Sequence, residues 1–240
     1  ENFPLKEWRK CINWALDKPS LQYGAYFGDP GLKKALTSYL FQSRGVKAQP
    51  EQIIIGSGTI NLMSLLATLF KNKTQHKMHR QIAFEEPGYQ SSRQIWQDYG
   101  YEILPIEVDA KNGIKLDLLA SWSPELVYLT PSHQYPLGCI MPVAHRLQIL
   151  QWAKDNDCYL IEDDYDSELN YINKPIPSLQ GLDKNGRVIN AVPGVKGSTN
   201  TATCLLKPAK AAALKTKWNA DGNAPSKQTG TIIYKFTLSK

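Results

Sequence analysis

Short β-branched or apolar runs alternate with helical patterns along most of this chain, and that alternation constrains its fold more than any other feature. The runs cover residues 52–55, 81–84, 101–104, 126–129, 158–161 and 187–189. Apolar residues at helical spacing lie at residues 32–44, 62–70, 89–99 and 146–156. Strands that alternate with helices predict a three-layer α/β fold, in which a mostly parallel sheet carries helices on both faces.

The positive charge of the chain is concentrated near its end. Residues 190–240 hold eight lysines and one acid, a balance of +7, whereas residues 1–189 hold 20 basic and 21 acidic groups, a balance of −1. Composition therefore gives no sign of a DNA-binding face on the main part of the chain. We predict one large domain, which is partial, over residues 1–189, and a basic, low-apolar tail or insertion over residues 190–240.

Composition also argues against a membrane, a metal site or a disulfide framework. No run approaches 18 apolar residues and the first residues do not resemble a signal peptide, so we expect no membrane partner and a cytoplasmic location. The four cysteines are far apart and form no CxxC pair. The acidic stretch Glu162–Glu168 lacks the spacing of a calcium loop, so no metal is expected there.

Polar loops follow the ends of four predicted strands, at Gly56–Thr59, Glu85–Tyr89, Thr130–Gly138 and Glu162–Glu168. Because the carboxyl ends of parallel strands lie along one edge of a sheet, the four loops are predicted to converge on one crevice. The glycine turn at Gly56–Thr59 precedes a helix, where a phosphate could bind, although such turns are also common as purely structural features. Taken singly, Tyr89 and His133 are better interpreted as ordinary loop residues that pack or hydrogen-bond.

Together these motifs resemble, in order and spacing, the aminotransferase-like domain of MocR-type transcription regulators of the GntR family. The resemblance spans roughly residues 1–189 and is carried by Tyr26–Pro30, Ser43–Val46, Ile53–Gly58, Glu85–Tyr89, Thr130–Gly138, Glu162–Glu168 and Leu179–Asp183. Such domains are fold type I pyridoxal phosphate (PLP) proteins, class I/II aminotransferases in the broad sense. The resemblance therefore implies the large domain of a PLP-dependent transferase, truncated here, with pyridoxal 5'-phosphate as cofactor.

The resemblance gives each loop a role. Asp163 would pair with the pyridine nitrogen of the cofactor, and Tyr165, two residues further on an extended segment, would donate to its phenolic oxygen. Tyr89 would stack on the ring. Ser57, Gly58 and Thr59 would hold the phosphate of the cofactor. Ser132 or His133 would lie near its phenolic oxygen.

Two lysines compete for the Schiff base with the cofactor. Lys240 ends the segment Tyr234–Lys240, which matches the local pattern expected from the resemblance. Lys196 stands at the expected distance from Asp163 but has lost that pattern. We favour Lys240, which requires an insertion of residues 190–233, and keep Lys196 as the alternative.

Two departures weaken the match. Family members usually carry glutamine where Ile60 and Asn61 stand, so the polar support beside the phosphate is changed. No arginine follows Arg187, although the family places later arginines on the cofactor phosphate and on the substrate carboxylate.

The resemblance implies Schiff-base chemistry with an amino compound or amino acid as effector or substrate, in a homodimer, with weak or no catalysis. DNA would be bound only through an N-terminal winged-helix domain, which is missing from this sequence. Two alternative functions stay open for the chain. It could be a fragment of a catalytic class I/II aminotransferase, or a non-catalytic remnant of such a domain that only forms dimers.

Overall fold

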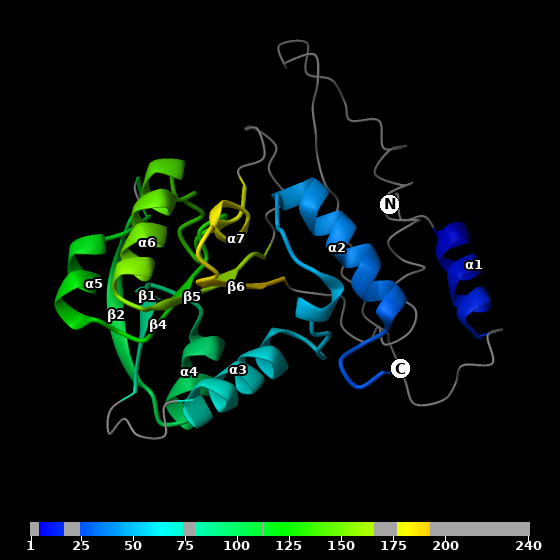
Figure 1. Cartoon of the computed structure of the whole chain (residues 1–240), viewed down its shortest axis with the longest axis horizontal. Helices are drawn as coiled ribbons and strands as arrows, with labels where there is room; N and C mark the ends of the chain where they lie inside the picture. The colour runs from blue at the N-terminus through cyan, green and yellow to red at the C-terminus, as the bar shows by residue number, and fades with distance from the viewer. Residues whose placement is uncertain (1–4, 17–24, 74–79, 112, 166–176, 193–240) are drawn as a thin grey trace, which may run out of the picture.

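A six-stranded sheet lies at the centre of the computed structural model, which describes residues 5–16, 25–73, 80–111, 113–165 and 177–192 (Figure 1). The strands are β1 (Gln81–Glu86), β2 (Glu102–Asp109), β3 (Gly113–Ile114), β4 (Leu126–Leu129), β5 (Tyr159–Asp163) and β6 (Val188–Ala191). Their order across the sheet is β3-β2-β1-β4-β5-β6, and only the pairing of β2 with the short edge strand β3 is antiparallel. Five parallel strands therefore end along one edge, which we call the carboxyl edge.

Helices cover both faces of this sheet, as predicted. The helices α3 (Thr59–Lys73) and α4 (Gln90–Asp98) pack on one face, and α5 (Leu116–Trp122), α6 (Val143–Asp155) and the short α7 (Leu179–Leu182) lie on the other (Figure 1). Strand β4 shows the alternation: Leu126 and Tyr128 belong to the core under α3 and α4, whereas Val127 and Leu129 belong to the other core. The three-layer α/β fold predicted from the sequence is confirmed.

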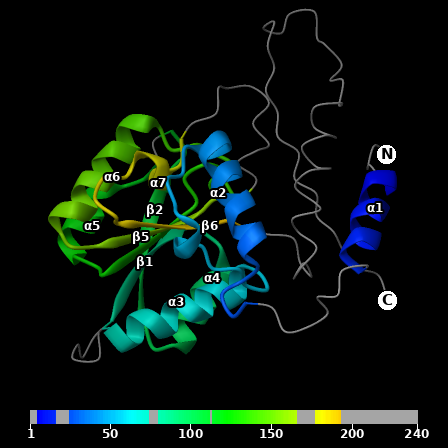
Figure 2. The same ribbon diagram turned by 45° about the vertical axis from the view of Figure 1, so that its right-hand side comes forward.

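The helix α2 (Pro30–Arg44) lies beyond the carboxyl edge, to one side of the layers (Figures 1 and 2). Asp29 begins it by accepting a hydrogen bond from the backbone N–H of Leu32 at 2.7 Å. Gly45 ends it with φ of 70°, a left-handed conformation that glycine adopts without strain. The helix end predicted at Arg44-Gly45 is thus confirmed. The remaining helices are α1 (Leu5–Leu16) and the single 3₁₀ turn η1 (Pro50–Gln52), and no helix of the described ranges is long and apolar enough to cross a membrane.

The strand predicted at residues 52–55 is wrong. Residues Ile53–Gly56 join no ladder of the described sheet, and η1 occupies the start of the run. Ile55 donates its backbone N–H to the carbonyl of Phe27 at 3.4 Å and packs against Gly28, where an added Cβ would lie 2.4 Å from the Ile55 side chain. β-branched residues favour extended backbone, but a strand also requires a neighbouring strand edge.

Leu160 tests the core beneath the site, because it is fully buried on β5. We expect Leu160→Ala to lower the free energy of unfolding by about 2–5 kcal/mol, since the cavity adds to the lost transfer free energy. Urea unfolding measures the change. Leu147→Ala, on the 51% exposed side chain of α6, is the matched control and should cost much less; equal losses in the two variants would contradict the assigned packing.

Candidate functional site

Three consecutive carboxylates lie at the end of β5 and just after it, and all are buried: Glu162, Asp163 and Asp164 are 0%, 5% and 2% exposed. Side chains alternate along an extended segment, so the middle carboxylate points to the opposite side from the other two. None of the three faces water, and each has different partners. These three carboxylates therefore need partners from the protein or from a ligand.

Glu162 holds the first turn of α7. Its carboxylate oxygens accept hydrogen bonds from the backbone N–H groups of Leu179 at 2.7 Å and Gln180 at 3.1 Å, and from the side-chain amide of Asn190 at 2.8 Å. The fully buried guanidinium of Arg146 lies 4.0 Å away. Glu162 is therefore a structural residue that ties α7 to β5 and β6.

Asp164 pairs with Arg44, the last residue of α2. Two guanidinium nitrogens donate to the two carboxylate oxygens, each at 2.8 Å. The same guanidinium also donates to the hydroxyl of Ser132, in the loop after β4. A bidentate pair that is 5% and 1% exposed at its side chains thus joins α2, the β5 end and the β4 loop.

Asp163 lies on the other side, among the residues packed under α3 and α4. Its Oδ2 accepts a hydrogen bond from the Tyr128 hydroxyl, and its Oδ1 is buried with no hydrogen-bond partner among the described residues. Burial raises the pKa of Asp163 to about 6, Tyr128 opposes this rise, and the neighbouring Asp164 adds to it. A buried carboxylate oxygen without a donor is the strongest sign of a ligand position in this structure.

Glu85 joins the loops that follow β1 and β4. It accepts hydrogen bonds from the backbone N–H of Thr130 at 3.1 Å, from the Thr130 hydroxyl, and from the Gln134 amide at 3.3 Å. Gln134 also donates to the carbonyl of Pro87 at 2.9 Å. Burial raises the pKa of Glu85 to about 7. This buried acid holds the Ser132 and His133 loop against the loop that carries Tyr89.

Aromatic rings from three loops meet at the carboxyl edge. Tyr165 stacks on His133 with ring centroids 5.6 Å apart and planes 10° apart. Tyr135 contacts Tyr165 and Tyr89 edge-on, at 6.5 Å and 6.0 Å between centroids. The sequence-predicted residues Tyr89, His133 and Tyr165 are therefore brought together, with Tyr135 between two of them.

The glycine turn before α3 supplies donors. At Gly58 φ is 127°, and an added Cβ would meet no atom within 4 Å, so the backbone there is open to an approaching group. The first N–H groups of α3, starting at Thr59, have no acceptor within the helix. The N–H of Ser57 contacts the Asn61 side chain at 3.3 Å, so the departure at residue 61 gives this turn an internal cap. Figure 1 shows α3 starting on the side of the carboxyl edge.

Other functional residues were not identified from the sequence. Tyr128 lies inside an apolar run that predicts only a strand, and Arg44 lies at the end of a predicted helix. Glu85 and Gln134 carried no specific signal beyond their place in the loop motifs. The two candidate lysines, Lys196 and Lys240, lie outside the described residues.

The family of the chain follows from comparison with known proteins. The family described as aminotransferase class I and II matches residues 1–172. The chain belongs to this family. The domain is 42% identical over 194 residues to the uncharacterized HTH-type transcriptional regulator YdeL of Bacillus subtilis, covering 78% of this chain and 40% of that protein. It is 37% identical over 190 residues to the probable rhizopine catabolism regulatory protein MocR of Rhizobium meliloti, covering 78% and 37%.

These relatives confirm the resemblance to MocR-type regulators, and the aminotransferase-like domain spans about 40% of their length. Among solved structures, it is similar to the kynurenine aminotransferase of Pyrococcus horikoshii, with a TM-score of 0.71 and 26% identity over 80% of this chain and 49% of that one. Membership of the family supports pyridoxal 5'-phosphate as the cofactor, as expected from the motifs.

The described residues of the aminotransferase-like domain fit this cofactor. The unpartnered Oδ1 of Asp163 suits the N–H of a protonated pyridine ring. The free N–H groups at the start of α3, behind the open backbone of Gly58, suit a phosphate. Both features are observed in the chain itself and do not depend on the comparisons.

The buried acids predict a pH dependence of stability. Glu85 has a pKa of about 7 against 4.5 in the unfolded chain, so the folded state holds its proton more tightly, and the unfolding free energy falls as pH rises from 4.5 through 7. Glu85 alone accounts for about 3 kcal/mol. Asp163 acts with the same sign, between 3.8 and about 6. Urea unfolding at pH 5 and pH 7.5 should show this loss, and Glu85→Gln should reduce it.

Glu107→Gln is the control for that measurement, because Glu107 forms an exposed ion pair with Lys115. This substitution should leave the pH dependence of the unfolding free energy nearly unchanged. A Glu85→Gln profile that coincides with that of the unsubstituted chain would contradict the raised pKa.

The pair of Arg44 and Asp164 predicts a non-additive effect. Arg44→Met leaves a buried carboxylate without its partner and should lower the unfolding free energy by about 3–5 kcal/mol. The double variant Arg44→Met with Asp164→Asn removes both charges and should recover part of this loss. Urea unfolding of the single and double variants measures the coupling; strictly additive losses would show that the pair contributes nothing as a unit.

Proposed function

We propose that this chain binds pyridoxal 5'-phosphate at the carboxyl edge and acts as the effector-sensing, aminotransferase-like domain of a MocR-type transcription regulator. The observation that carries the proposal is the buried Oδ1 of Asp163, which has no donor among the described residues and lies at the end of a parallel strand. In open parallel sheets, ligands bind outside such strand ends. The similarity to YdeL and MocR supports the regulatory role.

In this proposal each side chain has a separate task. Asp163 accepts the N–H of the pyridine ring, and Tyr89 stacks on the ring face. Tyr165, supported by the stacked ring of His133, donates to the phenolic oxygen, near which Ser132 also lies. The remaining contacts, with the phosphate, are made by Ser57, Gly58 and Thr59. When bound, the cofactor supplies an aldehyde for the amino group of an effector and a ring that withdraws electrons from it.

The lysine that bonds covalently to the cofactor is proposed to be Lys240, with Lys196 as the alternative. The small-molecule partner is an amino compound or amino acid. Weak or no catalysis is proposed for this chain, and DNA recognition is assigned to a region beyond these 240 residues.

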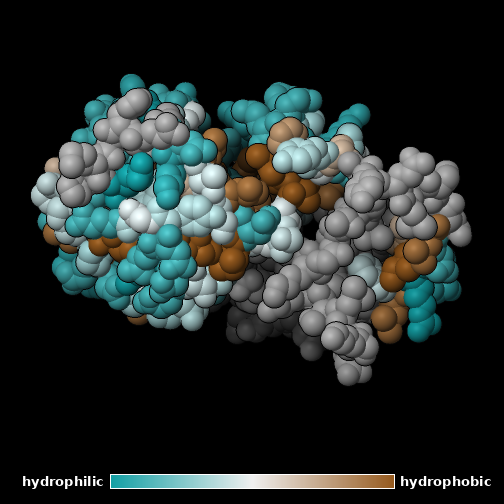
Figure 3. All heavy atoms as spheres, turned by 90° about the horizontal axis from the view of Figure 1, so that it is seen from below, coloured by the Kyte–Doolittle hydropathy of each residue, from teal (hydrophilic) through white to brown (hydrophobic). Residues whose placement is uncertain are grey.

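A homodimer is proposed for the chain. Apolar side chains are exposed on α3, where Ile60, Leu65 and Leu69 are 45%, 49% and 62% exposed. Figure 3 shows apolar residues among polar ones on the face that carries α3 and α4. Burial of such side chains against a second copy would be favourable, at about 25 cal/mol per Å² of apolar surface.

A catalytic aminotransferase is the second candidate. The aromatic-amino-acid aminotransferase 1 of Thermococcus litoralis is 28% identical over 201 residues, and the kynurenine aminotransferase of Pyrococcus horikoshii shares the fold. Turnover of an amino acid with a keto acid would favour this candidate. A change in the cofactor spectrum on addition of amine, without turnover, would favour the sensing role.

Cofactor binding is tested by adding PLP to the chain and to three variants. We expect a new absorbance band, a raised melting temperature and, after borohydride reduction, a label located by peptide mapping, because a ligand of the folded state stabilises it. Lys240→Ala should lose the label, Lys196→Ala should keep it, and Asp163→Asn should bind more weakly. The reverse lysine pattern would assign the bond to Lys196. Neither band nor stabilisation in the unsubstituted chain would overturn the proposal and favour a non-catalytic dimerising remnant.

A further inference from the structure

Tyr128 is the one side chain among the described residues that donates a hydrogen bond to Asp163. The two residues stand on neighbouring parallel strands, β4 and β5, in which Tyr128 pairs in register with Ile161. Tyr128 is 1% exposed, and its hydroxyl lies beneath the site rather than at its surface. The Tyr128 hydroxyl thus donates to Oδ2 from the interior of the protein, and Oδ1 has no hydrogen-bond partner among the described residues.

The direction of this hydrogen bond is set by the surroundings of the hydroxyl. Ser92 on α4 lies with its hydroxyl 3.5 Å from the Tyr128 oxygen, at the outer limit of a hydrogen bond, and is placed to donate to it. The pKa of Tyr128 is raised well above its ordinary value, first by burial and then by the charge of Asp163. Tyr128 therefore keeps its proton at neutral pH and can offer it to Asp163.

We propose that Tyr128 is a positioning residue of the site: by holding Oδ2 of Asp163 it directs Oδ1 toward the cofactor nitrogen and keeps the carboxylate ionised. The inference rests on the proposed function for the identity of the ligand. The interaction between Tyr128 and Asp163 stands on the structure of the chain alone.

Among the groups that surround Asp163, Tyr128 has the main influence that favours ionisation of the Asp163 carboxyl. Asp164, the residue after β5, is an acid that opposes ionisation of Asp163, and it is itself paired with Arg44. The charge of Asp163 in turn contributes to the raised pKa of Glu85 on β1. Burial also opposes ionisation of Asp163, and more strongly than Asp164 does. Tyr128 is the group that favours the charged form, because it donates to the carboxylate.

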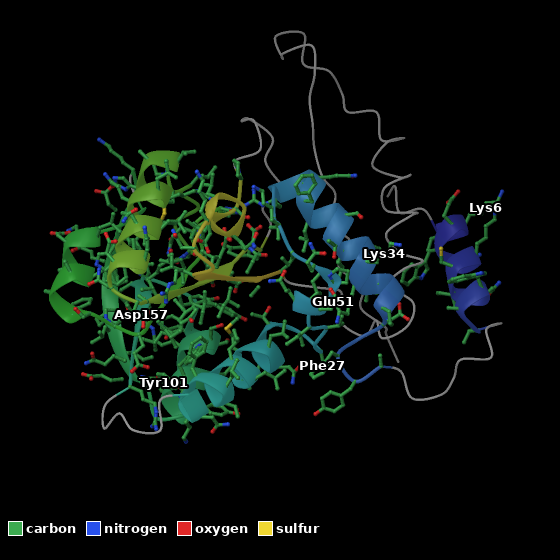
Figure 4. All side chains as sticks on the ribbon, viewed as in Figure 1. Lys6, Phe27, Lys34, Glu51, Tyr101 and Asp157 are labelled. Carbon is green, nitrogen blue, oxygen red and sulfur yellow. The ribbon has the colours of Figure 1, made fainter. Side chains whose placement is uncertain are left out.

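A purely packing role for Tyr128 can be separated from this one. Its ring stacks on Phe84 with centroids 4.6 Å apart and planes 20° apart. Tyr128→Phe keeps the ring and removes only the hydroxyl, so a packing role predicts no change at Asp163. Tyr101→Phe is the matched control, because Tyr101 is 4% exposed in the same core but precedes β2, at the opposite end of the sheet from the site (Figure 4).

Two measurements on the full chain test the inference. Carbon-13 NMR of labelled aspartate carboxyls follows the titration of Asp163 without cofactor, assigned by the signal that Asp163→Asn removes. Fluorescence titration gives the PLP dissociation constant between pH 6 and pH 8.5. We expect Tyr128→Phe to move the Asp163 midpoint to higher pH and to weaken PLP binding at pH 7 by about tenfold, with recovery at higher pH. Tyr101→Phe should change neither.

An Asp163 midpoint that is the same in Tyr128→Phe and in the unsubstituted chain would overturn the inference. So would PLP binding of equal strength and equal pH dependence in the two proteins. If the unsubstituted chain binds no PLP, the proposed function fails, while the NMR titration still decides whether Tyr128 controls Asp163. The two failures are therefore distinguishable.

Discussion

The site depends on the alternation of side chains along the last residues of β5. Three adjacent carboxylates are buried there, and each would be costly to bury without hydrogen bonds or an opposite charge. Glu162 receives backbone N–H groups of α7, and Asp164 receives a guanidinium. Asp163 points the other way and, within the described part of the chain, receives a single hydroxyl. The least compensated of the three carboxylates is thus the one at which a ligand gains most by donating a hydrogen bond.

Long-range contacts hold the loops of this site together. Arg44 and Asp164 are 120 residues apart in the chain, and Glu85 and Thr130 are 45 apart. Each contact pairs a buried acid with donors from a distant segment, so the loops are held by hydrogen bonds and an ion pair and not by apolar packing alone. Burial of an acid costs desolvation, which shows in the raised pKa of Glu85. The scaffold thereby gives up some stability to keep polar groups at the carboxyl edge.

Much of the fold could be predicted from local patterns. Five of the six expected strands exist, and β4 has the bounds of its apolar run, Leu126–Leu129, because buried parallel strands read as continuous apolar segments. The run at residues 52–55 failed, since strand formation requires a partner that no local pattern reveals. The short elements β3 and α7 were missed for the related reason that two to four residues carry too little periodicity to be recognised.

For the site, the polar loops after the predicted strands indicated the carboxyl edge, and the resemblance to a known family gave Asp163, Tyr89 and Tyr165 their expected roles. A sequence pattern involves neighbouring residues only, and it predicts which face of a strand each side chain occupies. It could not show that Asp164 is paired, that Glu162 holds α7, or that Tyr128 reaches Asp163. Those facts are decided by which segments are brought next to β5, because hydrogen bonds and ion pairs act only over a few ångströms and their partners are distant in the chain. The alternation of strands and helices along the chain thus determines the edge of the sheet at which a ligand can bind. The packing of β4, α2 and α7 around β5 decides which of the three acids keeps a carboxylate oxygen available to a ligand.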